Sequence, residues 1–417
     1  MAPTTDSTFD PAVLLPQVDA NLRNLIAFWR THGIDPDGGY NTVFDRDGTV
    51  VPTPLKTLVA QTRILWTYSS LAGHTGDTDL LGMAKYGFDY LVRAFHDETY
   101  GGWYWSVDAS GPRDPAKLMY GQSFALYALC AYATASGDPA ARDLATETFD
   151  RMHECVDMTY GGFWENVGRD WAPEDTASGR RKSLDIHLHL MESFTTLAAL
   201  TGAPTHRRRL AESRALLLGR MIDPVSGVGG NQYTADWTPL EPIVIDRTWI
   251  AERTDEATAP GQYTTSYGHN LELGWLLGRA DEVLGDPLSI HRGLVDHQAA
   301  HALRHGYDAE LGGIYREGPP LGAATDTDKE FWQNAEALIG FLHAYQVTGK
   351  REYADAMART WDFVTRYLIH PTLGEWRIRT TRTGQIVDDT LGNQWTGGYH
   401  TVRAALECHR RLVTLGG

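Results

Sequence analysis

A phrase that recurs six times along the chain constrains its fold more than any other feature of the sequence. The copies read IDPDGGYNTVFDRDG from residue 34, DETYGGWYWSVDASG from 97, DMTYGGFWENVGRD from 157 and, more weakly, IDPVSGVGGNQYTADW from 222, YDAELGGIYREG from 307 and IHPTLGEWRIRTTRTG from 369. Their starts lie about 60 residues apart, with one longer interval between the fourth and fifth copies. Each copy joins an acidic or proline-containing turn to glycine and then to a short aromatic run, which is typical of a turn that leads into a β-hairpin.

Between the copies, apolar residues follow the helical period, and each interval holds two such segments. The predicted helices span residues 12–31, 54–73, 78–96, 114–136, 139–156, 182–201, 205–222, 262–285, 288–305, 327–348, 351–369 and 396–414. A single helix pair cannot bury its apolar faces and must stack on its neighbours. Six pairs predict an all-α fold, an (α/α)6 barrel with short β-hairpin loops at one end. An open superhelix is the alternative.

The overall composition limits the domain organisation, the partners and the compartment. No linker rich in proline, serine or charge divides the chain, so residues 1–417 are predicted to form a single domain. The net charge of -16 argues against nucleic acid and anionic membranes as partners. The polar N-terminal stretch MAPTTDSTFDP and the lack of any apolar run of about 18 residues predict neither a signal peptide nor a membrane span. Three cysteines, Cys130, Cys155 and Cys408, lie in apolar helical patterns without CxxC spacing, which predicts reduced, buried thiols in a cytoplasmic protein.

Unusual polar and aromatic residues gather near the starts of the second helix of each pair. In such a barrel one helix of each pair lines the centre, so these residues are expected to converge at one end. They are Arg63, Tyr120, Gln122, Asp185, His189, His269, Glu272, Trp332, Gln333, Glu336, Trp395 and His400.

Histidines supply the first candidates for chemistry. A lone histidine on an apolar helix is more often a hydrogen-bonded core residue, but His189, His269 and His400 lie near the same end of three different helices. Asp185 and His189 share one helix face, being four residues apart, whereas His187 faces elsewhere and is predicted to be structural. Three residues separate His269 from Glu272, so the carboxylate is predicted to accept the imidazole N–H and fix its tautomer.

Arginine and tryptophan residues allow two interpretations each. Arg63 lies among apolar neighbours in VAQTRILW and needs a polar partner. That partner is either structural, such as Asp185 or Glu336, or an oxyanion that forms on a substrate. Trp332 and Trp395 are either core residues or aromatic walls, which suit the apolar faces of sugar rings.

Together these residues fit proton abstraction beside a sugar carbonyl. The carbon-bound proton is a very weak acid, so its removal needs a base held close and donors aimed at the growing enediolate oxygen. One histidine on each side of the plane allows inversion at carbon. A histidine on one side only allows proton transfer between neighbouring carbons.

Two competing interpretations remain open at this point. His189, His269, His400 and Glu272 are possible ligands for zinc or manganese, although no HExxH or other tight spacing supports a metal. A glycoside hydrolase on the same barrel would need two opposed carboxylic acids, for which Glu272 and Glu336 are the candidates. The hydrolase interpretation leaves the three histidines unexplained.

From about residue 20 to residue 412 the sequence resembles the N-acylglucosamine 2-epimerase superfamily, which also holds cellobiose 2-epimerases, mannose 2-epimerases and aldose–ketose isomerases. The stretches that carry this resemblance are QTRILWTYSS, YGQSFALYAL, HLHLMESFTTL, SYGHNLELGWLL, KEFWQNAEALIGFLHAYQVTG and WTGGYHTVRAALE. The family fold is an (α/α)6 barrel, in agreement with the repeat. The sequence looks closest to the cellobiose and mannose 2-epimerase branch.

The resemblance also implies a role for each matched residue, in a reaction without a cofactor. His269 and His400 would be the acid/base pair that flanks C2, and His189 would assist ring opening. Arg63 would hold the enediolate oxygens, and Glu272 would orient His269. Substrate contacts would come from Tyr120, Asp185, Trp332, Glu336 and Trp395.

Two departures from the family pattern bear on the substrate. Epimerases of this branch usually have asparagine where this chain has Asp185, which adds negative charge beside an enediolate. The chain also reads WTGGYH where disaccharide epimerases tend to read WKGPYH. We therefore expect a monomeric or homodimeric sugar 2-epimerase that acts on glucose and mannose or on the reducing end of a β-1,4-disaccharide such as cellobiose. Mannose–fructose isomerisation is the alternative on the same site, and a hydrolase or a glycan-binding barrel is the alternative of another class.

Overall fold

The structure, a computed structural model, describes residues 8–175, 180–240 and 264–416. Within them it contains twelve α-helices, as predicted. Their bounds are α1 Pro11–His32, α2 Leu58–Thr75, α3 Thr78–Phe95, α4 Met119–Ser136, α5 Pro139–His153, α6 Leu184–Thr201, α7 Pro204–Leu216, α8 Tyr267–Leu284, α9 Arg292–His301, α10 Phe331–Thr348, α11 Arg351–Phe363 and α12 Tyr399–Gly416. No helix in this part of the chain is long and apolar enough to cross a membrane.

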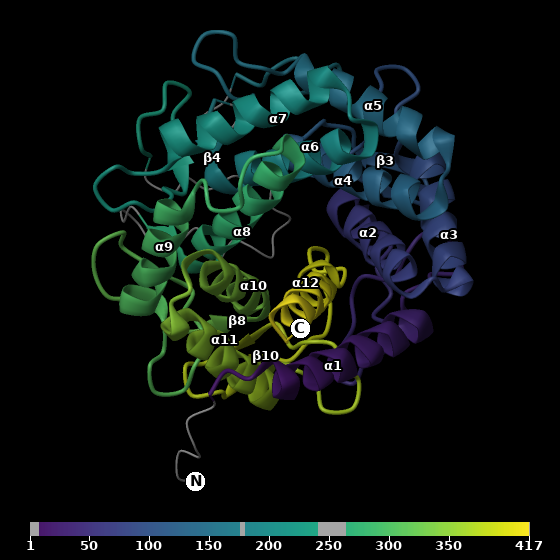
Figure 1. Cartoon of the computed structure of the whole chain (residues 1–417). Helices are drawn as coiled ribbons and strands as arrows, with labels where there is room; N and C mark the ends of the chain where they lie inside the picture. Colours follow the sequence, from purple (N-terminus) through teal and green to yellow (C-terminus); the bar gives the residue numbers. More distant parts are fainter. Residues whose placement is uncertain (1–7, 176–179, 241–263, 417) are drawn as a thin grey trace.

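The even-numbered helices form a closed inner ring, and the odd-numbered helices lie outside it (Figure 1). Around the ring each inner helix contacts the next, from α2 through α4, α6, α8 and α10 to α12, and α12 closes the ring against α2. Helices α3, α5, α7, α9 and α11 each contact the inner helix that precedes them, while α1 lies against α12. The closed ring confirms the (α/α)6 barrel and rules out an open superhelix.

The two classes of helix differ in how much of their surface is buried. In the inner helix α4, every residue from Met119 to Leu126 is buried, because neighbours cover it on several sides. The outer helix α3 instead buries one stripe, which is the amphipathic pattern of a helix that faces solvent. Its buried residues are Leu80, Ala84, Gly87, Phe88, Leu91 and Phe95. Five inner helices end at a glycine in the left-handed conformation, a common helix stop. These glycines are Gly76, Gly137, Gly202, Gly285 and Gly349.

Short strands form four small antiparallel sheets beside the starts of the inner helices. The strands are β1 Lys56–Thr57, β2 Ser106–Asp108, β3 Gly111–Asp114, β4 Lys182–Ser183, β5 Gln232–Tyr233, β6 Thr265–Ser266, β7 Glu317–Gly318, β8 Lys329–Glu330, β9 Arg379–Thr380 and β10 Ile386–Asp388. Their orders are β1-β2-β3, β10-β9-β8, β4-β5 and β6-β7. The strand before an inner helix therefore pairs with the hairpin of the next repeat.

These strands explain why the inner helices start later than their periodicity predicts. The predicted starts at 54, 114, 182, 262, 327 and 396 were two to five residues too early, and residues 262 and 263 lie outside the described chain. Strand pairing holds the residues just before α2, α6, α8 and α10 in extended conformation. Three outer helices also differ from the prediction at their ends. A π-helical turn follows each of α7, α9 and α11. These turns are η1 Leu217–Met221, η3 Ala302–Gly306 and η4 Val364–Leu368.

All six copies of the repeat form a similar turn, which is one residue shorter in the first copy than in the other five. Each closes with one antiparallel bridge, at Ile34–Tyr40, His96–Trp103, Val156–Phe163, Ile222–Gly229, Tyr307–Ile314 and Ile369–Trp376. In four copies the first aspartate of the turn binds a lysine that lies shortly before the following inner helix. The pairs are Asp35–Lys56 at 2.6 Å, Asp97–Lys117 at 3.0 Å, Asp157–Lys182 at 2.7 Å and Asp308–Lys329 at 2.9 Å. In these four copies the ion pair fixes the turn against the inner helix that follows it.

A second contact of the repeat explains His187. The fourth residue of five inner helices accepts a hydrogen bond from a backbone N–H in the adjacent turn. The acceptors are Gln61, Gln122, His187, Asn270 and Asn334. His187 Nε2 accepts from the N–H of Phe163, and its Nδ1 donates to the carbonyl of Ser183. The prediction that His187 is structural is therefore confirmed.

Removing one of the buried lysines is expected to destabilise the barrel. Lys182 is buried and bonds Asp157 and the carbonyl oxygens of Gly161 and Ala235. Lys182→Met leaves a buried carboxylate without its cation, which costs about 3 kcal/mol of unfolding free energy. Urea denaturation measures this loss. The matched control is Lys350→Met, whose ion pair with Asp296 is exposed. An equal effect in both variants would contradict the expectation.

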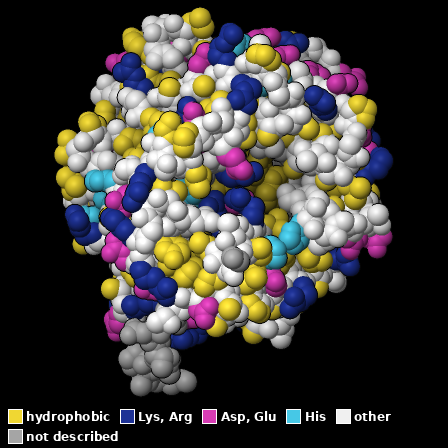
Figure 2. Space-filling view, in the orientation of Figure 1, with side chains coloured by type: hydrophobic (Ala, Val, Ile, Leu, Met, Phe, Trp, Pro, Cys, Tyr) yellow, Lys and Arg dark blue, Asp and Glu magenta, His cyan; other side chains and the backbone are white. Residues whose placement is uncertain are grey.

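The cysteines and the surface complete the description. Cys130, Cys155 and Cys408 are buried free thiols, as predicted. Acidic and basic side chains are interspersed over the face seen in Figure 2, with several Lys and Arg side chains near its middle.

Candidate functional site

The sixth residue of each of five inner helices points to one shared cluster of side chains. These residues are Arg63 in α2, Phe124 in α4, His189 in α6, Glu272 in α8 and Glu336 in α10. All five are buried. Because the ring brings equivalent helix positions to equivalent heights, the chain places a cation, an aromatic ring, an imidazole and two carboxyl groups close together.

His189 is oriented by a glutamate on its own helix. Its Nδ1 lies 2.9 Å from Oε2 of Glu192, three residues further along α6. Burial alone would raise the pKa of Glu192, but the charge of Arg403 and the bond from His189 outweigh it and lower the pKa to about 2. An ionised carboxylate only accepts hydrogen bonds, so Nδ1 of His189 carries the proton and Nε2 keeps its lone pair.

His400 is oriented in the same way from a neighbouring helix. Its Nδ1 lies 2.8 Å from Oε1 of Glu336, and Oε2 of that glutamate accepts from Trp275 at 3.0 Å. Burial lowers the pKa of His400 well below its usual value, and the nearby charges of Arg403 and Arg63 lower it further. Burial also lowers the pKa of His189, although Glu192 opposes this. Both imidazoles are therefore neutral near pH 7.

Arg63 contacts aromatic rings rather than either predicted carboxylate. Its guanidinium donates to the hydroxyl of Tyr120 at 2.9 Å and to the carbonyl of Trp395. It also lies over the rings of Phe124, at 4.3 Å, and Tyr399, at 4.9 Å. Among the described residues, Arg63 therefore does not pair with Asp185 or Glu336, the two structural partners that the sequence left open. Its Nε atom is buried there without a hydrogen-bond partner.

His269 contacts Trp332 and lies close enough to Asp185 to interact with it electrostatically. Its ring centroid is 4.7 Å from that of Trp332, and the same tryptophan lies 5.6 Å from His400. Burial acts to raise the pKa of Asp185, but the nearby His269 and then Arg181 outweigh it, so the pKa is lowered. Asp185 is therefore ionised, and its charge is balanced by groups other than Arg63.

The prediction that Glu272 accepts the imidazole N–H of His269 was wrong. Oε1 of Glu272 accepts from Arg403, and Oε2 has no hydrogen-bond partner among the described residues. The spacing of the two residues on α8 is compatible with contact, but a buried guanidinium competes for the carboxylate. Burial and the neighbouring Glu336 raise the pKa of Glu272 well above its usual value. On α6, by contrast, a glutamate three residues after a histidine does orient that histidine, in the pair His189–Glu192.

The structure brings all ten predicted site residues into one connected cluster. Ring contacts join Tyr120 to His189, at 5.5 Å, and to Trp395, at 6.4 Å. Glu192, Tyr399 and Arg403 also belong to the cluster and were not predicted from the sequence. A signal for Glu192 was available, because HLME repeats the spacing of HNLE. Arg403 follows His400 by three residues, but nothing in the sequence indicates its partners.

The residues best placed to hold a cation already bind Arg403. Within the described residues, Glu272, Glu336 and His400 form the one group whose ligand atoms lie within 4.8 Å of one another. The guanidinium of Arg403 donates to Oε1 of both glutamates. Those oxygens therefore already bind a positive group, and His189 and His269, which the sequence suggested as ligands, are not part of this group.

Known proteins resemble this chain over nearly its whole length. A model of the N-acylglucosamine 2-epimerase family (GlcNAc 2-epimerase) matches residues 38–404. A cellobiose 2-epimerase of Ruminococcus albus is 29% identical over 403 residues, covering 94% of this chain and 97% of that one. A D-mannose isomerase of Marinomonas mediterranea is 25% identical over 406 residues, covering 95% and 97%.

A solved structure agrees with the sequence comparison. The cellobiose 2-epimerase from Spirochaeta thermophila DSM 6192 matches with a TM-score of 0.83 and 30% identity, covering 97% of this chain and 98% of that one. The resemblance found in the sequence and the barrel fold are thereby confirmed. The chain belongs to the N-acylglucosamine 2-epimerase family.

Proposed function

We propose that the chain is a sugar 2-epimerase that needs no cofactor and interconverts the C2 epimers of an aldose through an enediolate. The observation that carries this proposal is the position of two imidazoles beside one tryptophan. His269 from α8 and His400 from α12 both contact the ring of Trp332. A sugar bound against that ring would have one imidazole within reach of each side of C2.

His400 is suited to take the proton from C2. Its Nδ1 donates to Glu336, so its Nε2 lone pair is the basic atom, and burial keeps the ring neutral. As the C2–H bond breaks, its electrons form the C1–C2 double bond and the carbonyl oxygen becomes an enediolate oxygen. The guanidinium of Arg63 would stabilise that negative charge.

His269 is suited to return a proton to C2 from the opposite face. The ionised Asp185 acts on it electrostatically, which favours its protonated form. After one turnover His400 holds a proton and His269 has lost one, so solvent exchange restores both. His189 would hold the sugar hydroxyls and assist ring opening, with its tautomer fixed by Glu192.

Neither the hydrolase nor the metal interpretation is favoured. A glycoside hydrolase needs two carboxyl groups that face each other across the bond to be cleaved. Glu272 and Glu336 instead bind the same nitrogen of Arg403. The names of the relatives point the same way, because they are cellobiose 2-epimerases and D-mannose isomerases.

A panel of sugars tests the proposed reaction and its substrate. Metal-stripped protein is incubated with mannose, glucose, fructose and cellobiose, and the products are read by NMR. Glucose from mannose, or glucosyl-mannose from cellobiose, supports the 2-epimerase. Fructose from mannose would identify an aldose–ketose isomerase and would make Asp185 the residue to explain. Release of a smaller sugar from cellobiose would contradict both.

The enzyme is expected to remain active at a lower pH than a histidine base with the ordinary pKa would allow. The base must be unprotonated, and the pKa of His400 is lowered from 6.5 by burial and by Arg403. The decrease of kcat/KM with falling pH should therefore have its midpoint below pH 6.5, the pH at which an ordinary histidine is half protonated. A profile measured from pH 4.5 to 8 checks this. An acid limb above pH 6.5 would exclude His400 in this environment as the base.

We also propose that the enzyme acts in the cytoplasm. The support is that its three cysteines are free and buried, which suits a reducing compartment.

A further inference from the structure

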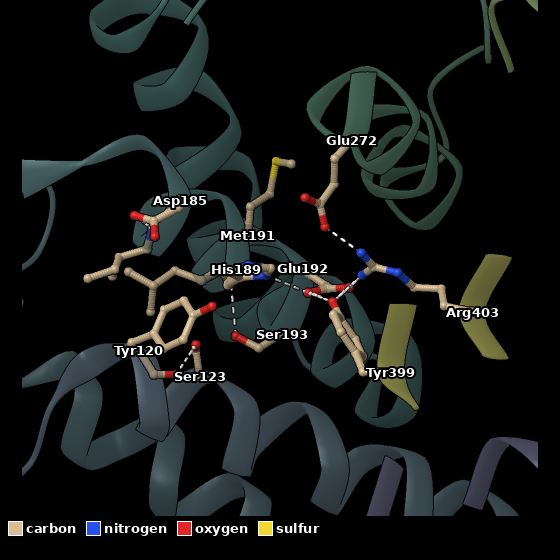
Figure 3. A network of polar contacts seen from close by, with 12 residues as sticks. Tyr120, Ser123, Asp185, His189, Met191, Glu192, Ser193, Glu272, Tyr399 and Arg403 are labelled. Atoms are coloured by element: carbon tan, nitrogen blue, oxygen red, sulfur yellow. Dashed lines mark hydrogen bonds and ion pairs between the residues drawn. The ribbon is translucent and has the colours of Figure 1, made fainter. Parts of the chain in front are cut away.

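Arg403 joins three inner helices through one buried guanidinium, and Figure 3 shows it beside Glu192 and Glu272, on two of these helices. It lies one turn beyond Tyr399 on α12 and is 2% exposed. Its Nη1 donates to Oε1 of Glu192 on α6, and its Nη2 donates to Glu272 on α8 and, at 2.6 Å, to Glu336 on α10. An arginine in a surface ion pair would not contact three carboxyl groups from three different helices, as Arg403 does.

The orientation of this guanidinium is fixed from both sides. Arg403 lies over the ring of Tyr399 at 4.1 Å and near that of Trp275 at 5.1 Å. The hydroxyl of Tyr399 lies 2.8 Å from both carboxylate oxygens of Glu192. Arginine is suited to such a position because its donors form a rigid planar fork.

Two of the three carboxylates also bind histidines of the site. Oε2 of Glu192 accepts from His189, and Oε1 of Glu336 accepts from His400. In each case the imidazole uses Nδ1, and the same carboxylate is held by Arg403. The two imidazoles come from α6 and α12, which lie opposite each other in the ring of six inner helices, and they are connected through a single cation.

We propose that Arg403 is a positioning residue that fixes the tautomers of His189 and His400 together. By holding the two carboxylates, it directs both Nδ1–H groups away from the substrate and leaves both Nε2 lone pairs for it. The consequence for catalysis rests on the sugar chemistry proposed above, whereas the control of the tautomers does not.

Glu192→Gln tests this control because an amide has only one oxygen. A guanidinium can only donate, so Arg403 should keep the amide oxygen, and the NH2 group should then face Nδ1 of His189. His189 must accept there, and its proton must move to Nε2. Nitrogen-15 NMR of histidine-labelled full-length protein, without substrate, distinguishes the two tautomers. Spectra of His189→Asn and His400→Asn assign the signals.

A double variant isolates the contribution of Arg403. In Glu192→Gln with Arg403→Met, no guanidinium holds the amide oxygen, so the oxygen can turn to His189 and restore its Nδ1–H tautomer. The expected result is therefore a tautomer change in the single variant and its reversal in the double variant. The same tautomer of His189 in wild type and in both variants would overturn the proposal.

Arg403→Lys extends the test to His400. A lysine keeps the charge but cannot form the planar fork, so both His189 and His400 should lose their single Nδ1–H form and populate both tautomers. The matched control is Glu407→Gln, one turn further along α12, where the carboxylate binds Arg410 instead. Unchanged tautomers of both histidines in folded Arg403→Lys would overturn the proposal. If that variant does not fold, the Glu192→Gln comparison decides alone.

Turnover gives a separate readout that depends on the proposed function. Glu192→Gln is expected to lower kcat by about 10²-fold with little change in KM, because a misplaced donor affects the reaction more than binding. Absence of turnover in wild type with every sugar would contradict the proposed function and leave the tautomer result standing.

Discussion

His269→Ala and His400→Ala are each expected to lower turnover by about 10²–10⁴-fold while the barrel remains folded. Each imidazole is proposed to move the proton on one face of C2, and alanine offers no group that can replace it. The loss should appear mainly in kcat, since Trp332, the proposed sugar contact, is unchanged in both variants. Steady-state kinetics on the substrate that the panel identifies measure the effect, with circular dichroism to confirm the fold.

The matched control for these variants is a buried histidine that the repeat uses structurally. His187→Gln places at the fourth position of α6 the residue that α2 and α4 already have there, Gln61 and Gln122. It should keep wild-type turnover. Wild-type turnover in either alanine variant would contradict the two-base mechanism.

Arg403→Met is expected to cost about 3–5 kcal/mol of unfolding free energy, because it leaves buried carboxyl groups without their common cation. The sign of its pH dependence follows from those groups. Burial already raises the pKa of Glu272 and Glu336 in the folded state, and loss of the arginine raises both further. Groups whose folded pKa is raised stabilise the fold at low pH and lose that contribution as pH rises. The deficit should therefore be larger at pH 8 than at pH 5.

Urea denaturation at both pH values measures this deficit. Arg410→Met is the matched control, since Arg410 lies on the same helix but its bond to Glu407 is exposed. An exposed pair of this kind contributes about 0–1 kcal/mol. Equal losses for Arg403→Met and Arg410→Met, or a deficit that does not change with pH, would contradict the assignment of Arg403 as a buried counter-ion.

The repeat made the barrel predictable from the sequence. Copies of one turn motif at a regular interval, with two helical segments between them, leave few arrangements that bury every apolar face. The starts of the inner helices were less predictable, because the residues before α6 have helical periodicity but pair as a strand with Gln232 and Tyr233. That pairing joins segments about 50 residues apart, and a local pattern does not record it.

The position of the site was also predictable, but its internal connections were not. Helix spacing alone places Arg63, His189 and Glu336 near the same end of the ring. The partner of a buried charge depends on side chains that are distant in sequence, as in the pair Arg403–Glu192, which spans 211 positions. Glu272 shows the consequence. Its local spacing suggested His269 as its partner, whereas a guanidinium from α12 binds it.

The measurement that tests the proposed reaction most directly is the incubation of the protein in D2O with the sugar it converts. Abstraction and return of the C2 proton by two exchangeable imidazoles predicts that the product epimer carries deuterium at C2, with the carbon skeleton unchanged. Both NMR and mass spectrometry detect this label. An epimer that forms with its original hydrogen retained at C2 would contradict proton transfer through His269 and His400.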